Sequence, residues 1–219
     1  MSQRTRIKIC GLTREADVEA AAEAGADAIG FVFYAASARH VSFERAGVLA
    51  RRLPPFVTPV GLFVNAEPAE IDAAVRAIPT LLLQFHGDET PAQCSAPGRP
   101  FIRAARVGKG FDLLDFAARF EAADAILLDA HVDGYGGGGK VFDWSHARAA
   151  LARPVVLSGG LHAGNVLQGI QQLRPWAVDV SSGVESADAP EKGIKDADSI
   201  RRFCDAVREA DARIEASVA

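Results

Sequence analysis

The sequence predicts a (β/α)8 barrel built as a single domain from all 219 residues, and two observations carry this prediction. Eight short apolar runs rich in β-forming residues lie at about 6–10, 28–34, 58–64, 80–85, 101–107, 125–130, 154–158 and 177–181. Stretches with helical periodicity separate them. Strand and helix alternating eight times is the pattern of this barrel, and the length lies near the lower end of the roughly 200 to over 400 residues that such barrels span.

Parallel pairing follows from the composition of the strands. The run Ile126-Leu127-Leu128 is apolar at every position rather than at every second one. Such runs are typical of a parallel sheet that is covered on both faces. An open doubly wound sheet has the same property, so it remains the alternative architecture.

The helices are predicted from apolar residues three or four positions apart, a spacing that gives one buried face. This spacing occurs at Ile71, Val75 and Ile78, at Leu113, Phe116, Ala117 and Phe120, and at Ile200, Phe203, Cys204 and Val207. Residues that favour a helix start are Thr13, Ser42, Pro68 and Asp112, and Gly25 favours a helix end.

Two segments give a weaker pattern. Thr90 to Ala96 is short and is followed by Pro97-Gly98, so it predicts a brief helix at most. The tail from Asp211 to Ala219 is polar and rich in alanine, and we expect it to fray.

Composition and charge exclude several functions. The net charge is −4 and basic residues are scattered, which argues against sequence-independent binding of nucleic acid. No apolar run approaches the roughly 18 residues of a membrane span, and the first residues lack the apolar core of a signal peptide. We therefore expect a cytoplasmic protein without a membrane partner. A barrel of this size can be a monomer or a homodimer, and the sequence does not distinguish the two.

The metal-binding residue types show no ligand spacing. The three cysteines include no Cys-x-x-Cys pair, and the five histidines include no pair at i and i+4. We therefore predict reduced thiols and no metal site.

Two strand ends carry small turns that contain glycine. Val155-Val156-Leu157 runs into Ser158-Gly159-Gly160, and Val178-Asp179-Val180 runs into Ser181-Ser182-Gly183. Glycine lets backbone N–H groups approach an anion closely because it has no Cβ. The turns predict a phosphate site formed by Gly159, Gly160, Ser182 and Gly183, and hence a phosphorylated small-molecule substrate.

Cys10 stands at the end of the first strand, beside Gly11 and shortly before a helix. A helix N-terminus and the ammonium group of Lys8, two residues back on the same face, would each favour the thiolate. Cys10 is therefore a candidate catalytic residue, although a free cysteine often only fills space in a core. Lys8 has a second possible role, because it could instead pair with Asp179 on the eighth strand.

Asp129 ends an apolar strand, where partial desolvation favours the neutral carboxyl that a general acid requires. A helix cap is the alternative role, but the next helix is expected to begin near Asp143. Gln84 and His86 end the fourth strand, and for His86 a pocket-lining role and a structural role are equally open. Arg39, after the second strand, could hold a carboxylate through its planar guanidinium or could be solvated.

The glycine-rich run Gly134 to Lys140 matches two nucleotide-binding motifs in form only. A P-loop needs Ser or Thr after the lysine, and Val141 stands there. A dinucleotide-binding turn has an acidic residue about 20 positions on, where this chain has Ser158-Gly159. We expect a flexible loop that folds over the substrate, with Lys140 available for an anion.

Several short segments along the whole chain form a specific combination. They are Lys8 to Thr13, Gly30 to Tyr34 with Ser37 and Arg39, Gln84 to Gly87, Leu127 to Asp129, Gly136 to Trp144, Leu157 to Leu161 with Asn165-Val166, and Val178 to Glu185 followed by Lys195-Asp196. In this combination and order the chain resembles the phosphoribosylanthranilate isomerase family of tryptophan biosynthesis.

The resemblance implies an Amadori rearrangement without a cofactor. N-(5-phosphoribosyl)anthranilate would become 1-(2-carboxyphenylamino)-1-deoxyribulose 5-phosphate, the third step of the tryptophan branch from chorismate. Asp129 would match the general acid that protonates the ring oxygen, so that a Schiff base forms. Cys10 would match the general base that takes the C2 proton and gives an enolamine. Arg39 would face the anthranilate carboxylate, and Gly159-Gly160 and Ser182-Gly183 would hold the phosphate.

Two positions depart from the pattern of the family. Gly138 stands where Ser or Thr is usual, and Lys192 replaces a common Pro before Gly193. Both changes lie in loops, and the extra glycine should loosen its loop and affect KM more than the chemistry.

Two other functions remain open. A different phosphosugar barrel enzyme, such as indole-glycerol-phosphate synthase, would be expected to use a lysine at a strand end, which Cys10 and Asp129 fit poorly. A non-catalytic phosphosugar-binding protein would keep the phosphate site but have no turnover. Replacing Cys10 by Ala would distinguish an enzyme, which loses turnover while it still binds ligand, from a binding protein.

Overall fold

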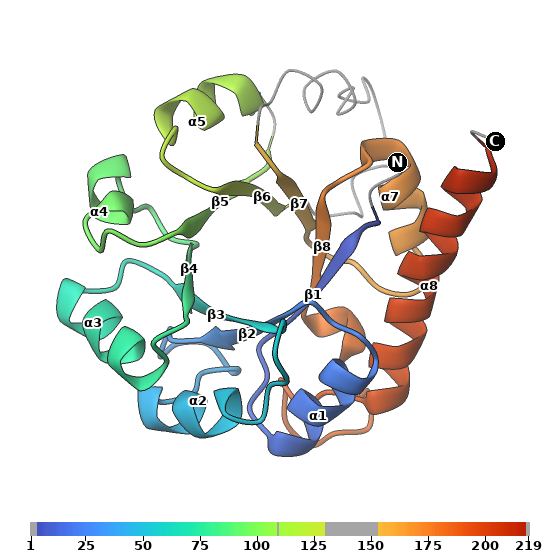
Figure 1. Cartoon of the computed structure of the whole chain (residues 1–219), viewed down its shortest axis with the longest axis horizontal. Helices are drawn as coiled ribbons and strands as arrows, with labels where there is room; N and C mark the ends of the chain where they lie inside the picture. The colour runs from blue at the N-terminus through green and yellow to red at the C-terminus, as the bar shows by residue number, and fades with distance from the viewer. Residues whose placement is uncertain (1–3, 109, 130–152, 218–219) are drawn as a thin grey trace.

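The computed structural model describes residues 4–108, 110–129 and 153–217. Within them, eight parallel strands form a closed barrel in chain order, and the helices lie around its outside (Figure 1). The strands are β1 (Arg6–Cys10), β2 (Ala28–Val32), β3 (Thr58–Phe63), β4 (Leu82–Phe85), β5 (Phe101–Arg106), β6 (Ala125–Asp129), β7 (Val155–Ser158) and β8 (Ala177–Val180). The helices are α1 (Glu15–Glu23), α2 (Phe43–Ala50), α3 (Pro68–Ala77), α4 (Pro91–Ser95), α5 (Leu113–Arg119), α7 (Val166–Leu173), the short 3-10 helix η2 (Ser182–Val184) and α8 (Ala197–Ala216).

The barrel closes between β8 and β1. These two strands pair in parallel, with Lys8 opposite Asp179. An open sheet would leave both strands as edges. The predicted barrel is therefore confirmed, and the open doubly wound alternative is excluded.

Strand residues alternate between two apolar environments, which explains the runs that lack polar positions. Ile126 and Leu128 of β6 pack in the main core together with helix residues. Between them, Leu127 belongs to a smaller cluster formed by strand residues inside the barrel. On β1 the same alternation puts Ile7 and Ile9 in the main core, so Lys8 and Cys10 face the barrel interior as predicted.

Helix starts follow local side-chain chemistry at most of the predicted positions. Ser42 accepts a hydrogen bond from the backbone N–H of Arg45 at the start of α2, and Asp112 caps α5 in the same manner. Pro68 is the first residue of α3. Thr13 is an exception, because α1 begins at Glu15 with Arg14 in the cap position and no side-chain capping bond.

Other local predictions have mixed outcomes. Gly25 follows the end of α1 with a φ of 84°, in the left-handed region that glycine tolerates. The brief helix predicted around Thr90 is present as α4, five residues long. The run Gly134 to Lys140 with Gly138, and the helix start expected near Asp143, lie outside the described residues.

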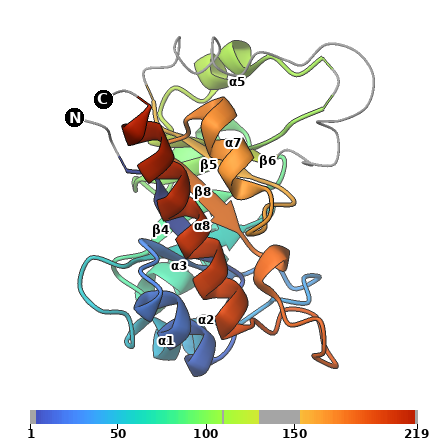
Figure 2. The ribbon, with the colours of Figure 1, turned by 90° about the vertical axis from the view of Figure 1, so that its right-hand side faces the viewer.

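The end of the chain differs from the expected frayed tail. Helix α8 continues to Ala216 and lies along the outside of the barrel (Figure 2). It packs against α1 and α7. Near its end, Asp211 accepts hydrogen bonds from the backbone N–H of Thr5 at 2.8 Å and from its hydroxyl at 2.7 Å. These tertiary contacts stabilise a segment whose composition alone indicates fraying.

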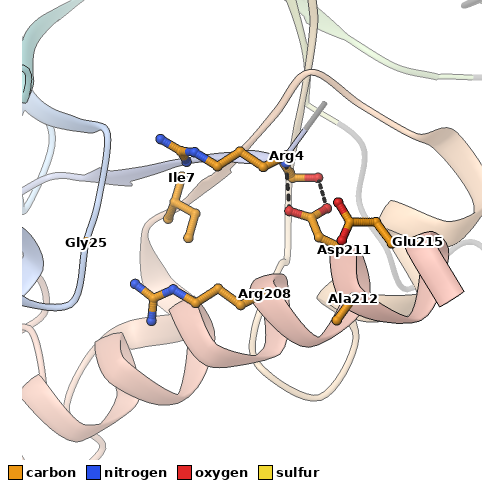
Figure 3. A pocket seen from close by; sticks show the side chains of 8 residues that line it. Arg4, Ile7, Gly25, Arg208, Asp211, Ala212 and Glu215 are labelled. Atoms are coloured by element: carbon orange, nitrogen blue, oxygen red, sulfur yellow. Dashed lines mark hydrogen bonds between the residues drawn. The ribbon is translucent and has the colours of Figure 1, made fainter. Parts of the chain in front are cut away.

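A pocket of about 380 Å³ lies between the start of β1 and the second half of α8 (Figure 3). Its lining residues are Arg4, Thr5, Ile7, Gly25, Arg208, Asp211, Ala212 and Glu215. In Figure 3 both dashed hydrogen bonds end on Asp211. The pocket lies at the amino end of β1, whereas barrel enzymes bind their substrates at the carboxyl ends of the strands. A substrate site is therefore expected at the other end of the barrel.

Replacing Asp211 by Ala is expected to lower the free energy of unfolding by about 1–3 kcal/mol, because two hydrogen bonds to a carboxylate are lost at the buried Thr5. Urea unfolding measures the change. Asp205→Ala on the same helix is the control, since the side chain of Asp205 is exposed and forms a surface ion pair with Arg208 at 2.9 Å. Equal effects of the two substitutions would contradict this role for Asp211.

Candidate active site

A buried ion pair crosses the seam of the barrel. Lys8 Nζ lies 2.8 Å from Asp179 Oδ1, and the two side chains are only 4% and 6% exposed. Burial opposes the charge of Lys8, but Asp179 and Cys10 more than compensate, and its pKa is raised above the ordinary lysine value. The hydroxyl of Ser158, at the end of β7, contacts the other oxygen of Asp179 at 3.4 Å. The alternative pairing of Lys8 with Asp179 is therefore present.

Cys10 is buried at the carboxyl end of β1. Its sulfur lies against Gly30 of β2, where a Cβ atom would come within 2.6 Å of Sγ. The sequence predicts that Lys8 and the nearby helix N-terminus favour the thiolate. In the structure burial outweighs these effects and raises the pKa of Cys10. The charge of Lys8, and its hydrogen bond to the sulfur, act in the opposite direction. Lys8 thus interacts with both Asp179 and Cys10.

Asp129 ends β6 and lies beside the histidine that follows β4. Its Oδ2 atom is 3.2 Å from His86 Nε2, and the other ring nitrogen of His86 is 3.2 Å from Gln84 Nε2. An amide nitrogen only donates, so this arrangement assigns the proton of a neutral His86 to Nε2, which donates to Asp129. The three predicted residues Gln84, His86 and Asp129 are therefore brought together in one chain of contacts.

Gln84 also presents an acceptor to the barrel interior. The residue is fully buried. Its Oε1 atom has no hydrogen-bond partner among the described residues. A buried oxygen without a partner costs free energy unless a ligand or water satisfies it.

The loop that carries His86 is held by a buried ion pair that sequence reasoning missed. Arg103 of β5 donates to the carbonyl oxygens of Phe85 and Gly87, both at 2.9 Å, and contacts Glu89 at 3.2 Å. Glu89 accepts from the backbone N–H of Gly87 at 2.9 Å. The signal available in the sequence is a charged residue, Arg103, in the interior of β5 among apolar neighbours.

The two glycine turns after β7 and β8 meet at the same end of the barrel. Gly159 and Gly160 have φ values of 93° and 62°, which other residues rarely adopt. Gly183 lies against the other turn, because a Cβ there would fall 1.9 Å from the carbonyl oxygen of Leu161. Ser182 and Gly183 begin η2, whose first backbone N–H groups have no partner within that helix. The turns can therefore present N–H groups to an anion.

Arg39 is oriented by a carboxylate of the chain itself. Its Nε atom donates to Glu185 Oε1 at 2.5 Å, and Lys195 Nζ contacts the same oxygen at 3.1 Å. Burial opposes ionisation of Glu185, but Arg39 and Lys195 prevail and lower its pKa. Sequence reasoning included Glu185 and Lys195 only within the resemblance and gave them no role.

Among residues 4–108, 110–129 and 153–217, no three His, Cys, Asp or Glu side chains are grouped to hold a metal ion. Within the same residues, no helix has the length and apolar character needed to cross a bilayer. Lys140 lies outside them.

Comparison with known proteins gives concordant results. A family model described as N-(5'-phosphoribosyl)anthranilate (PRA) isomerase matches residues 7–206. The N-(5'-phosphoribosyl)anthranilate isomerase of Methylibium petroleiphilum is 72% identical over 214 residues, 98% of this chain and 99% of the relative. The phosphoribosyl anthranilate isomerase of Thermotoga maritima is 42% identical, with a TM-score of 0.80 over 94% of this chain and 99% of that structure.

A further similar structure contains a ligand. It is a phosphoribosyl anthranilate isomerase in complex with reduced 1-(o-carboxyphenylamino)-1-deoxyribulose 5-phosphate, and it is 40% identical to this chain. The TM-score is 0.79, over 94% of this chain and 99% of that structure.

Proposed function

The chain belongs to the N-(5'-phosphoribosyl)anthranilate isomerase family, and on this premise we propose that it converts N-(5-phosphoribosyl)anthranilate to 1-(2-carboxyphenylamino)-1-deoxyribulose 5-phosphate in tryptophan biosynthesis. The observation that supports it best is the grouping of four features at one end of the barrel. A thiol ends β1, a carboxyl ends β6, and glycine turns follow β7 and β8. This end is where barrels bind their substrates.

Asp129 is the proposed general acid. It gives a proton to the ring oxygen of the ribose as the C1–O bond breaks, and the lone pair of the anthranilate nitrogen forms the C1=N bond of a Schiff base. Its side chain is one-third exposed, so substrate can reach it. His86, at 3.2 Å, orients the carboxyl. A proton transfer of this kind typically contributes about 10²–10⁴-fold to the rate.

Cys10 is the proposed general base. Its thiolate takes the proton from C2, and the electrons of that C–H bond form C1=C2 while those of C1=N return to the nitrogen. The enolamine then becomes the ketone when C1 gains a proton and the C2 hydroxyl loses one. Lys8 supports this role because its charge lowers the pKa of the thiol against the effect of burial.

The remaining site residues bind the substrate in this proposal. Arg39 faces the anthranilate carboxylate. Gln84 offers its buried Oε1 to a hydroxyl or amine of the substrate. The phosphate lies in the two glycine turns, against Gly159, Gly160, Ser182 and Gly183. Asp179 keeps Lys8 in place through their 2.8 Å ion pair.

The direct test is the loss of anthranilate-type fluorescence when purified protein meets phosphoribosylanthranilate generated in situ. Rapid loss that depends on protein concentration, with formation of the deoxyribulose product, is expected. No loss from well-folded protein would leave a phosphosugar-binding protein or a different barrel enzyme as the function.

A further inference from the structure

Lys195 is a fully buried lysine that the proposed mechanism does not use. It lies between η2 and α8, and its side chain is 0% exposed. Burial lowers its pKa, whereas Glu185 and Cys10 favour its charged form. Keeping an ammonium group in such a place is costly unless it makes several polar contacts.

The ammonium group makes these contacts toward the candidate active site. Lys195 Nζ donates to the carbonyl oxygen of Ser181 at 2.9 Å and lies 3.3 Å from its hydroxyl. It also contacts Glu185 Oε1 at 3.1 Å. The group thus joins the end of β8 to the carboxylate that holds Arg39.

From each of these two partners the contacts continue to a proposed site residue. The hydroxyl of Ser181 donates to the carbonyl oxygen of Cys10 at 3.0 Å, across the seam between β8 and β1. Glu185 Oε1 accepts from Arg39 Nε at 2.5 Å. The ammonium group of Lys195 therefore lies between the backbone of Cys10, the proposed base, and the guanidinium of Arg39, which is proposed to bind the carboxylate.

The backbone around Lys195 is itself anchored. Glu185 and Lys195 form a β-bridge, flanked by a hydrogen bond from Asp196 N–H to the Val184 carbonyl at 2.9 Å. The carbonyl of Lys195 accepts from Arg14 Nη2 at 3.0 Å. The side chain therefore extends from a fixed point rather than from a free loop.

We propose that Lys195 is a positioning residue that holds Cys10 and Arg39 at a fixed separation, so that the C2 proton meets the base when the anthranilate carboxylate is bound. This inference rests on the proposed isomerase function and adds a residue to it. Lys195 touches neither reacting atom; it acts through Ser181 on one side and through Glu185 on the other.

Replacing Lys195 by Met tests the proposal, because Met keeps most of the volume and removes the charge. We expect kcat to fall by about 10²-fold, since a displacement near 1 Å at a reacting group costs about that much. KM should rise as well, because Arg39 loses its support. Lys192→Met is the matched control: Lys192 is exposed and lies three positions away, so both constants should stay unchanged.

The pH profile gives a readout that a purely structural role would not change. Within the described part of the chain, the charged groups that act on Cys10 are Lys8 from β1, Asp179 from β8 and Lys195. Lys195 lowers the pKa of the thiol, so its removal should shift the rising limb of kcat against pH to higher pH. Lys192→Met should leave this limb in place.

Two further variants test the contacts of Lys195 with Ser181 and with Glu185 separately. They serve as the test of the proposal if Lys195→Met does not fold. Ser181→Ala removes the contact with Cys10 and should lower kcat about tenfold with KM nearly unchanged. Glu185→Gln weakens the support of Arg39 and should mainly raise KM. A folded Lys195→Met enzyme with the kcat, KM and pH profile of the wild type would overturn the inference. A wild type without turnover would instead count against the isomerase function.

Discussion

Replacing Asp129 by Asn is expected to lower kcat by at least about 10²-fold while the barrel stays folded. Asn has the size of Asp and can still accept from His86 Nε2, which lies 3.2 Å from Oδ2 in the structure. An amide has no acidic proton for the ring oxygen, so opening of the ribose loses its acid. Turnover is followed by the loss of substrate fluorescence, and folding by circular dichroism and thermal unfolding.

Asp88→Asn is the matched control for this experiment. Asp88 lies two positions after His86, its side chain is 79% exposed, and its carboxylate contacts Arg106 on the surface at 3.5 Å. The same chemical change there should leave turnover as in the wild type. Near-normal turnover of Asp129→Asn would remove Asp129 from the mechanism.

The barrel was predictable because its determinants are local. The run Ile126-Leu127-Leu128 contains no polar position, and in the structure its members alternate between the main core and the cluster inside the barrel. Capping by Ser42 and Asp112 depends only on residues two or three positions away. Interactions over such short separations can be read from the chain directly.

The two local features that differ from prediction depend on distant contacts. The segment after Asp211 is polar and looks weak by itself, yet Asp211 bonds to Thr5, 206 positions earlier. At α1, Arg14 takes the cap position in place of Thr13, and its guanidinium donates to the carbonyl oxygen of Lys195, 181 positions on. Composition near a helix end does not contain this information.

The candidate site also contains residues that the sequence predicts and supporting contacts that it does not predict. Cys10, Asp129 and the glycine turns are predicted from the rule that barrel chemistry lies at the carboxyl ends of strands, and in the structure each of them lies at or directly after such an end. The supports of these residues are contacts between segments far apart, such as Arg39 with Glu185, 146 positions on. The direction in which the pKa of the Cys10 thiol shifts also depends on burial, and the sequence does not give the extent of burial.

Replacing Cys10 by Ala is expected to lower kcat by about 10²–10⁴-fold, the usual contribution of a general base. The protein should still bind reduced 1-(o-carboxyphenylamino)-1-deoxyribulose 5-phosphate, an analogue of the product. The substitution removes one buried sulfur beside Gly30 and leaves the 2.8 Å pair between Lys8 and Asp179 in place. Binding should therefore persist, because no group proposed to hold the phosphate or the carboxylate is changed. Single-turnover fluorescence measures the chemical step, and titration with the analogue measures binding.

Cys94→Ala and Cys204→Ala are matched controls, because they remove equally buried thiols on α4 and α8. Neither of these two thiols ends a strand of the barrel, so neither lies at the candidate site. Each control should lose some stability from the cavity it leaves but retain full turnover. Loss of turnover in Cys10→Ala alone, with ligand affinity kept, identifies the thiol at the end of β1 as the base. Loss of both turnover and affinity would instead assign Cys10 to substrate binding, and unchanged turnover would leave the C2 proton to another residue.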